Sequence, residues 1–245
     1  YDPARVSTRA ARGRDGFLVT GHKTLVLHAP CADRLIVIAR TAGQASDRDG
    51  ISPFLVCADA PGLQRRDYRT LDGAAASDIA FSDTPAALLG KEGAALPAIE
   101  KILDEAVVAV CAEACGVLQK LVDLTVEYTR QRRQFGRAIA EFQVLQHRMV
   151  DMLIEVKQAG ILTRMARAQL ETSVRAAAVS AAKSRVGRAC RLVSQAAVQL
   201  HGGIGIADET SVSQYFRRAL MIEQQFGSTE FHLERYERLQ LSAYG

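Results

Sequence analysis

The sequence predicts an α+β protein, in which an antiparallel β-barrel or β-sandwich domain is followed by a C-terminal up-down four-helix bundle. Short apolar runs with the two-residue period of strands fill residues 1–90, and no helical pattern lies between them. Near Gly90 the apolar period changes to three and four residues, the period of helices, and it persists through residues 91–245. Since a run of strands followed by a run of helices is typical of separate domains, we place the boundary at residues 89–93.

Four segments of the first domain have the character of strands. They alternate apolar and polar residues or form short apolar runs, and they are rich in Val, Leu and Ile. These segments are residues 17–29, 34–40, 51–58 and 78–83. Turn-forming residues that end in glycine recur between them at about strand-length spacing, which favours an antiparallel barrel or sandwich.

The second domain contains three long helical patterns and several shorter ones. The first long helix begins after Glu92 and ends before Phe135, the second covers about residues 142–170, and the third covers about residues 174–200. Shorter helices lie within residues 211–241. Gly202 and Gly203 follow the third pattern, at the place where glycine commonly ends a helix. Long antiparallel helices with short connections predict a bundle.

The composition excludes several classes of protein. Hydrophobic residues make up 48% of the 245 residues and charged residues 24%, which is typical of a globular chain. No window approaches about 18 uninterrupted apolar residues, so we expect no membrane span. The net charge is only +4, aromatic residues are 6% and tryptophan is absent, so we expect no nucleic-acid partner.

The five cysteines are odd in number and scattered: Cys31, Cys57, Cys111, Cys115 and Cys190. Cys111 and Cys115 are one helical turn apart, but no His or carboxylate at ligand spacing completes a metal site. We therefore interpret the cysteines as buried small apolar residues, expect no metal, and expect a reducing, cytoplasmic location.

A group of arginines surrounds the helix break at residues 135–136: Arg130, Arg132, Arg133 and Arg137. Guanidinium groups beside exposed backbone donors are well suited to bind a pyrophosphate. A solvated basic helix end is the alternative, because positive charge is favourable at a helix C-terminus. The glycines that follow Leu200, taken alone, predict only a helix cap.

Residues 128–152 and 199–205, in this order, resemble the C-terminal helical domain of the acyl-CoA dehydrogenases, flavoproteins that desaturate acyl-CoA thioesters at the α,β position. Residues 132–136 match the Arg-x-x-Phe-Gly signature, a Phe-Gln pair stands ten residues after the Arg, and residues 199–203 match a Gln-x-x-Gly-Gly segment. The resemblance implies FAD contacts, partly to the cofactor of a neighbouring subunit. The implied positions are Arg132, Arg133, Gln134, Phe135, Phe142, Gln143, Gln199, Leu200, His201, Gly202, Gly203 and Ser228.

The first domain is similar to the middle β-domain of the same family, where a Gly-x-Lys segment leads into a strand that lines the flavin. The matching positions are Leu25, Val26 and Leu27, although many members carry a Trp and a Thr on this strand. The resemblance covers nearly the whole chain. The N-terminal helical domain with which a complete member begins is absent from this sequence.

The residue at the usual position of the catalytic base is not a carboxylate in this sequence. Most of the family has a Glu directly before a Gly-Thr pair, and the matching residue here is Phe226, whose phenyl ring cannot remove a proton. A few branches place the base on the first long helix, which corresponds to Ala106. We expect Glu105 to be the base, with Glu230 as a second candidate; solvated helix carboxylates are the alternative. The implied substrate positions are Asp104, Glu105, Ala106 and Val107.

Two functions remain open on these residues. The chain is either an FAD-dependent acyl-CoA dehydrogenase of fatty acid metabolism with a relocated base, or a partner subunit that completes the flavin site of a heteromer. Residues 111–152 resemble a subgroup that includes pimeloyl-CoA dehydrogenase small subunits and steroid side-chain dehydrogenase subunits, which often work as two unlike chains. The implied partners are an acyl-CoA substrate, an electron-transfer flavoprotein or similar acceptor, and either copies of this chain (a homodimer or homotetramer) or another dehydrogenase chain (a heterotetramer). A non-enzymatic helical scaffold is the third reading.

Overall fold

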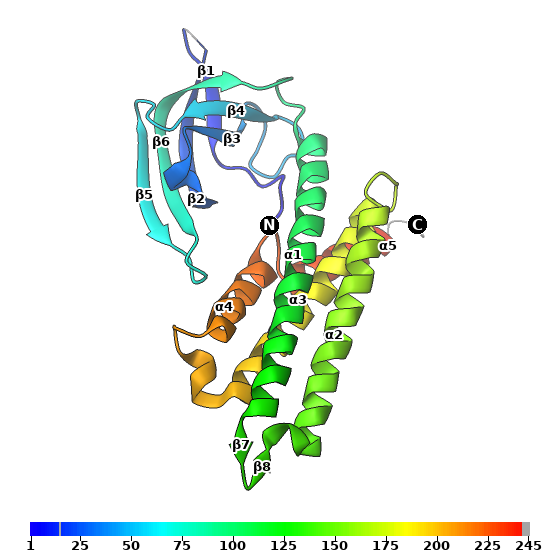
Figure 1. Cartoon of the computed structure of the whole chain (residues 1–245). Helices are drawn as coiled ribbons and strands as arrows, with labels where there is room; N and C mark the ends of the chain where they lie inside the picture. The colour runs from blue at the N-terminus through cyan, green and yellow to red at the C-terminus, as the bar shows by residue number, and fades with distance from the viewer. Residues whose placement is uncertain (15, 242–245) are drawn as a thin grey trace. The chain divides into compact units, whose positions relative to one another are not determined.

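The computed structural model describes residues 1–14 and 16–241, and its first unit is built on a six-stranded sheet (Figure 1). The strands are β1 (Arg9–Arg12), β2 (Phe17–Leu27), β3 (Arg34–Arg40), β4 (Ile51–Cys57), β5 (Leu63–Arg69) and β6 (Ala75–Leu88). The order is β2-β1-β3-β4-β6-β5. A further pairing of β2 with β6 closes β2, β1, β3, β4 and β6 into a barrel, and β5 lies at its edge. All pairings are antiparallel except β1 with β3, so the predicted β-barrel is confirmed.

The core of the β unit follows from the alternation along its strands. Val19, Val37, Val56 and Phe81 are buried, and Phe54 packs on Phe17 with ring centroids 5.0 Å apart. Two strands escaped sequence prediction. β5 has charged or polar residues at most positions and no apolar alternation, because it is an edge strand that pairs only with β6. β1 is only four residues long.

Arg40, at the end of β3, is a buried charged residue that organises one end of the barrel. Only 1% of it is exposed, and its guanidinium donates to six backbone carbonyl groups. The acceptors belong to Ala4, Val6, Ala42, Ala45, Asp47 and Asp49. Because a buried charge must be hydrogen-bonded, Arg40 fixes the N-terminal segment and the loop between β3 and β4 together.

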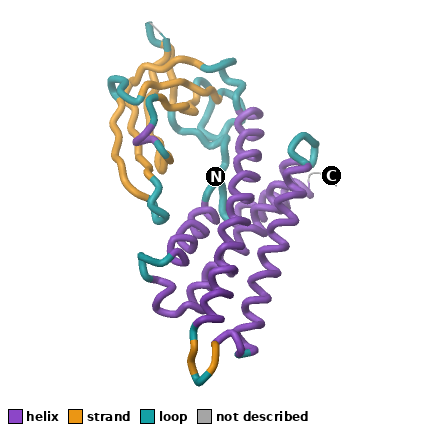
Figure 2. The backbone as a smooth tube through the Cα atoms, viewed as in Figure 1, coloured by secondary structure: helices purple, strands orange, loops and turns teal. Residues whose placement is uncertain are grey.

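The described residues from 96 onward are mainly helical, as predicted, and form a bundle with a fifth helix (Figure 2). The helices are α1 (Leu96–Gln131), α2 (Gln143–Ala168), α3 (Arg175–His201), α4 (Ser211–Gln224) and α5 (Thr229–Leu241). The chain divides into two compact units, residues 2–102 and residues 103–245 together with Tyr1, so about the first two turns of α1 belong with the sheet. The boundary at residues 89–93 stays a prediction.

Helix α3 lies in the middle of the helical unit and packs against α2, α4 and α5 (Figure 1). Its small residues allow this, because they let neighbouring helices approach closely. Ala182, Ala189 and Ala197 are buried, and a Cβ added at Gly187 would lie 2.3 Å from Thr229 Oγ1. The alanine-rich composition that predicted a helix here therefore also explains its central position.

The surface differs from the sequence-based prediction in one respect. Cys111 and Cys190 are buried in the bundle core as predicted, whereas Cys31 and Cys57 are exposed; that part of the prediction was wrong. Cys57 is the last residue of β4 and Cys31 ends a short 3₁₀ helix, so neither side chain reaches a core.

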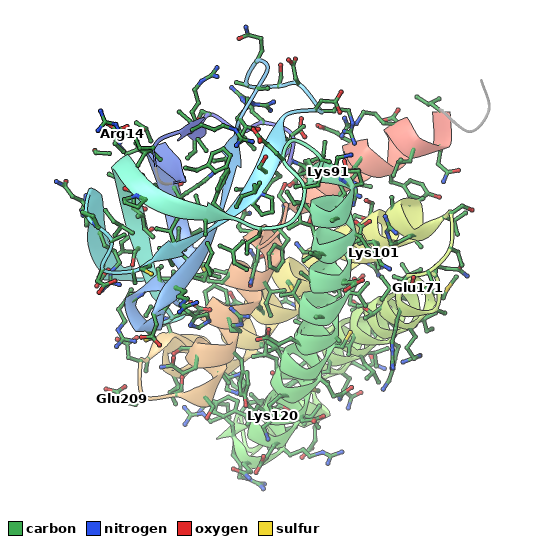
Figure 3. The ribbon with its side chains drawn as sticks, turned by 90° about the horizontal axis from the view of Figure 1, so that it is seen from above. Arg14, Lys91, Lys101, Lys120, Glu171 and Glu209 are labelled. Atoms are coloured by element: carbon green, nitrogen blue, oxygen red, sulfur yellow. The ribbon has the colours of Figure 1, made fainter. Side chains whose placement is uncertain are left out.

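Figure 3 marks charged residues in loops of the β unit, Arg14 and Lys91. Among helices of the described residues, none has both the length and the apolar character that crossing a membrane requires.

Candidate functional site

A short β-hairpin connects α1 to α2 and carries the predicted signature. Its strands are β7 (Arg133–Gln134) and β8 (Arg137–Ala138), and the two residues between them both have positive φ, 54° at Phe135 and 79° at Gly136. This is the backbone that a two-residue hairpin loop requires. Phe135 is 90% exposed at the tip, so the hairpin presents an aromatic ring to the outside of the chain.

The arginines of the hairpin are in two different situations. The guanidinium carbon of Arg137 lies 4.0 Å from the ring centroid of Phe142, and that ring meets Phe135 edge-on at 6.1 Å. The side chains of Arg132 and Arg133 are exposed, and no acidic group within the described part of the chain pairs with either. Arg137 therefore supports the hairpin, while the guanidinium groups of Arg132 and Arg133 are accessible from outside the chain.

The second predicted segment lies at the end of α3. The helix ends at His201, and a 3₁₀ turn (Gly202–Ile206) follows, with φ 63° at Gly202. A Cβ at Gly202 or Gly203 would have no atom within 4 Å, so the backbone of both glycines is open to a ligand. At Gly205, in contrast, a Cβ would lie 2.8 Å from the carbonyl oxygen of Val198, so that glycine serves packing.

A ring stack joins the two segments. Tyr128, in the last turn of α1, stacks on His201 with centroids 4.4 Å apart and an interplanar angle of 24°. His201 Nδ1 lies 2.8 Å from the carbonyl oxygen of Ala197, and because a carbonyl only accepts, Nδ1 carries a proton. The backbone N–H of Arg132 donates to the carbonyl of Tyr128 at 2.8 Å. The base of the hairpin and the glycine segment are thereby held side by side at one end of the bundle.

This arrangement fits the diphosphate of a dinucleotide. Guanidinium groups without acidic partners provide charge-assisted donors, and open glycine backbone provides N–H groups that no Cβ shields. Gln199 is exposed and Leu200 is buried under the turn. Gln143 is exposed at the start of α2, next to Phe142. The cofactor roles of these residues stay predictions.

The β-unit positions predicted to line a flavin lie on β2. Leu25 has φ 53° at an irregularity in the pairing of β2 with β6, its N–H donates to Asp78 Oδ1 at 3.1 Å, and its side chain is 51% exposed. Val26 and Leu27 are partly buried. All three side chains are apolar, so they offer a ligand packing but no side-chain hydrogen bond.

The turn between α4 and α5 contains the usual base position. Phe226 has φ 60° and Gly227 has φ 116°, and the Phe226 side chain is 38% exposed. Ser228 Oγ accepts from the N–H of Phe231 at 3.3 Å, so Ser228 caps α5. A hydroxyl engaged in this way fixes the start of the helix, and its cofactor role stays a prediction.

The predicted substrate residue Asp104 is engaged inside the bundle. Its side chain is 2% exposed and accepts from Arg175 Nε at 3.0 Å and from Arg235 Nη1 at 2.8 Å. Both oxygens are occupied, so Asp104 positions α3 and α5 against α1. Val107 is buried in the same helix, and Ala106 is partly buried.

The two candidate bases differ in their surroundings. Glu105 is exposed on α1. Glu230 is bound to Arg191 Nη2 at 2.6 Å, and this hydrogen bond lowers the pKa of Glu230. Arg191 also binds Glu223 at 2.7 Å. An ion-paired carboxylate with a lowered pKa is a weaker base, so the geometry favours Glu105 over Glu230.

Sequence reasoning overlooked a buried lysine, Lys183, in the middle of α3. A signal was present, because Lys183 lies four residues after Val179 and three before Val186, on the apolar stripe of that helix. A charged residue on such a stripe is buried, and a buried charge needs specific partners. Within the residues that the structure describes, no group of three or more His, Cys, Asp or Glu is arranged to hold a metal ion.

Two family models match the chain, one on each side of Gly90, where the spacing of apolar residues changes from that of strands to that of helices. The acyl-CoA dehydrogenase middle domain matches residues 1–84, and the acyl-CoA dehydrogenase C-terminal domain matches residues 96–240. Among curated proteins, the CarC subunit of the caffeyl-CoA reductase–Etf complex of Acetobacterium woodii is 30% identical over 223 residues, which cover 88% of this chain and 59% of that protein.

Solved structures agree. A glutaryl-coenzyme A dehydrogenase in complex with glutaryl-CoA superposes with a TM-score of 0.90 at 26% identity, covering 98% of this chain and 62% of the other. The ChsE4–ChsE5 complex of Mycobacterium tuberculosis gives a TM-score of 0.83 at 26% identity, covering 96% and 62%. The chain spans about three-fifths of the length of the relatives that it matches.

Proposed function

Because this chain belongs to the acyl-CoA dehydrogenase family, we propose that it binds FAD and takes part in the α,β-desaturation of an acyl-CoA thioester. One observation carries the proposal: the stack of Tyr128 on His201 holds the arginine-bearing hairpin beside an open glycine segment. An anion that spans both segments would meet guanidinium groups on one side and backbone N–H groups on the other.

The residues of this chain have separate tasks in the proposed site. Arg132 and Arg133 bind the diphosphate, and Gly202 and Gly203 let their backbone approach it closely. When bound, the flavin supplies the chemistry of hydride acceptance. Phe135 packs against the cofactor. Because its ring is 90% exposed within one chain, we infer that the hairpin reaches the cofactor of a neighbouring subunit.

Removal of the substrate's α-proton needs a carboxylate that is free to accept it. Phe226 has no ionisable group, Asp104 is bound by two arginines, and Glu230 is bound by Arg191. Of the carboxylates predicted as base or substrate residues, Glu105 remains, and we propose it as the base of the catalytic alternative, with Ala106 and Val107 near the acyl group.

The second candidate function is that of a partner subunit, and Phe226 favours it. A chain whose α4–α5 turn carries a hydrocarbon at the base position can complete a flavin site without removing the proton itself. Two relatives carry names of assemblies: the ChsE4–ChsE5 complex, and CarC as a subunit of a complex that includes Etf. For this chain we propose another dehydrogenase chain as partner and an electron-transfer flavoprotein as acceptor.

Flavin uptake and its reduction test the proposal. We expect the purified chain, alone or co-expressed with a dehydrogenase-like chain, to retain FAD, and the flavin to lose its yellow colour when an acyl-CoA thioester is added without oxygen. Glu105→Gln should abolish this bleaching in a homo-oligomer and leave it intact in a heteromer whose base lies on the partner. A chain that takes up no FAD under either condition would contradict the proposal.

The hairpin arginines provide the site-specific control. Arg132→Gln/Arg133→Gln removes two charge-assisted contacts, so the dissociation constant of FAD should rise by at least about tenfold. Arg164→Gln/Arg167→Gln removes the same charge from exposed positions of α2 and should leave the affinity unchanged. Equal effects of both pairs would mean that net charge, and not the hairpin, governs binding.

A further inference from the structure

Lys183 is a buried cation whose two hydrogen-bond acceptors lie at the end of α4 and in the turn that follows it. It lies in the middle of α3 and is fully buried, and its Nζ donates to the carbonyl oxygens of Glu223 at 2.9 Å and Gly227 at 2.6 Å. Burial lowers the pKa of Lys183. Since an ammonium group loses its hydration on burial, these two carbonyls must compensate for it.

The carboxylate of Glu223 is engaged elsewhere. Its Oε1 accepts from Arg191 at 2.7 Å and from the N–H and Oγ1 of Thr229 at 3.1 and 2.9 Å. The ammonium of Lys183 therefore lies against carbonyl groups at the C-terminal end of α4, where the helix dipole favours positive charge. Glu223 meanwhile connects that end to the start of α5.

Three positions of α3 contact this turn. Lys183, Gly187 and Arg191 are spaced by four residues and so share one face of the helix. Lys183 holds two carbonyls, Gly187 leaves room for Thr229, and Arg191 binds Glu223. One stripe of α3 thus holds residues 223–229 from end to end.

The backbone of Phe226, in this turn, is strained and held by hydrogen bonds, whereas its side chain is not held by any. Phe226 has φ 60°, a conformation that is unfavourable for a non-glycine residue, and its carbonyl accepts from His232 Nε2 at 3.1 Å. The hydrogen bonds to the turn engage backbone groups or the side chains of Glu223, Gln224, Ser228 and Thr229, and none engages the side chain of Phe226, which has no hydrogen-bonding atom. The turn therefore presents the side chain of residue 226 while its backbone is fixed from behind.

We propose that Lys183 is a positioning residue, whose ammonium fixes the turn and so sets the direction in which residue 226 projects into the ligand site. This rests on the proposed function, in which position 226 borders the thioester. Lys183 itself is buried behind the turn and acts only through the carbonyls of Glu223 and Gly227.

Fluorine NMR tests the direction of residue 226 without reference to activity. The chain is labelled with 4-fluorophenylalanine at its eight Phe positions, and the Phe226 resonance is assigned with Phe226→Leu. Lys183→Met and Lys183→Gln should shift or broaden that resonance. In the flavin-loaded protein they should also weaken binding of butyryl-CoA by about tenfold or more, as loss of a buried hydrogen-bonding charge predicts. Lys157→Met, on the exposed surface of α2, should change neither.

Each outcome decides the proposal. A lower melting temperature with an unchanged Phe226 resonance would overturn it, because Lys183 would then only stabilise the bundle. A shifted resonance with unchanged thioester affinity would also overturn it, because the direction of residue 226 would then not affect the ligand site. If Lys183→Met does not fold, Lys183→Gln, which keeps a donor group, decides in its place. A wild-type chain without flavin would contradict the proposed function, and the fluorine comparison would still decide whether Lys183 fixes the turn.

Discussion

At the scale of single residues, a directional chain of hydrogen bonds leads to the Phe226 turn. Arg235 Nη1 donates to Ser180 Oγ at 3.3 Å, Ser180 Oγ lies 3.3 Å from His232 Nδ1, and His232 Nε2 lies 3.1 Å from the carbonyl oxygen of Phe226. Because a carbonyl only accepts, Nε2 carries the proton of the imidazole. Nδ1 is then free to accept the hydroxyl of Ser180, so this chain of hydrogen bonds is complete with neutral His232.

This histidine should make the stability of the chain depend on pH. Burial lowers the pKa of His232 from 6.5 to about 4. Below about pH 6.5 the imidazole of His232 is protonated in the unfolded chain, but in the folded chain it is protonated only below about pH 4. The free energy of unfolding therefore decreases as the pH is lowered from about 6.5 to about 4. At pH 5 the loss should be about 2 kcal/mol. Urea unfolding at about pH 7.5 and 5 measures it, and His232→Gln should remove this part.

His147 provides the matched control for that measurement. It is exposed on α2, so His147→Gln should leave the difference in unfolding free energy between the two pH values as in the wild type. If His232→Gln also leaves the difference unchanged, the folded chain protonates His232 as readily as the unfolded chain. The directional chain of hydrogen bonds would then be wrong.

At the scale of secondary-structure elements, local patterns predicted what is local. The long helices and four strands were found because their periodicity is written in consecutive residues, and the hairpin and glycine segment because each is a contiguous motif. β5 was missed because an edge strand with polar residues has no alternation. The partners of Asp104 could not be predicted, since Arg175 and Arg235 lie 71 and 131 residues away along the chain.

The contact between α3 and α5 should be sensitive to one methyl group. Gly187→Ala raises helix propensity by about 1 kcal/mol, but its Cβ would lie 2.3 Å from Thr229 Oγ1, and such overpacking costs about 1–3 kcal/mol. We expect a net destabilisation of about 1 kcal/mol, measured by urea unfolding. Gly116→Ala on α1 meets no atom within 4 Å and should stabilise the chain by up to about 1 kcal/mol. Stabilisation by both substitutions would contradict the close packing at Gly187.

At the scale of the whole molecule, each compact unit has its own core and its own buried cation. The β unit packs around residues such as Phe54 and contains Arg40, and the helical unit packs around residues such as Leu118 and contains Lys183. Each cation binds backbone carbonyls of a turn or loop instead of a carboxylate. Periodicity indicates that Lys183 is buried, but it identifies the acceptors of neither cation, because these are backbone groups that any sequence would provide.

Arg40→Met should therefore destabilise the β unit and leave the helical unit as protected from hydrogen exchange as in the wild type. It leaves six carbonyls of the barrel end without their donor, at a cost of about 3 kcal/mol or more. Hydrogen exchange measured by mass spectrometry should show faster exchange in β3, β4 and residues 41–50, with unchanged protection in α2 to α5. Arg40→Lys keeps the charge and three donors and should fall between the wild type and the Met variant. Equal loss of protection in both units would instead mean that they unfold as one cooperative body.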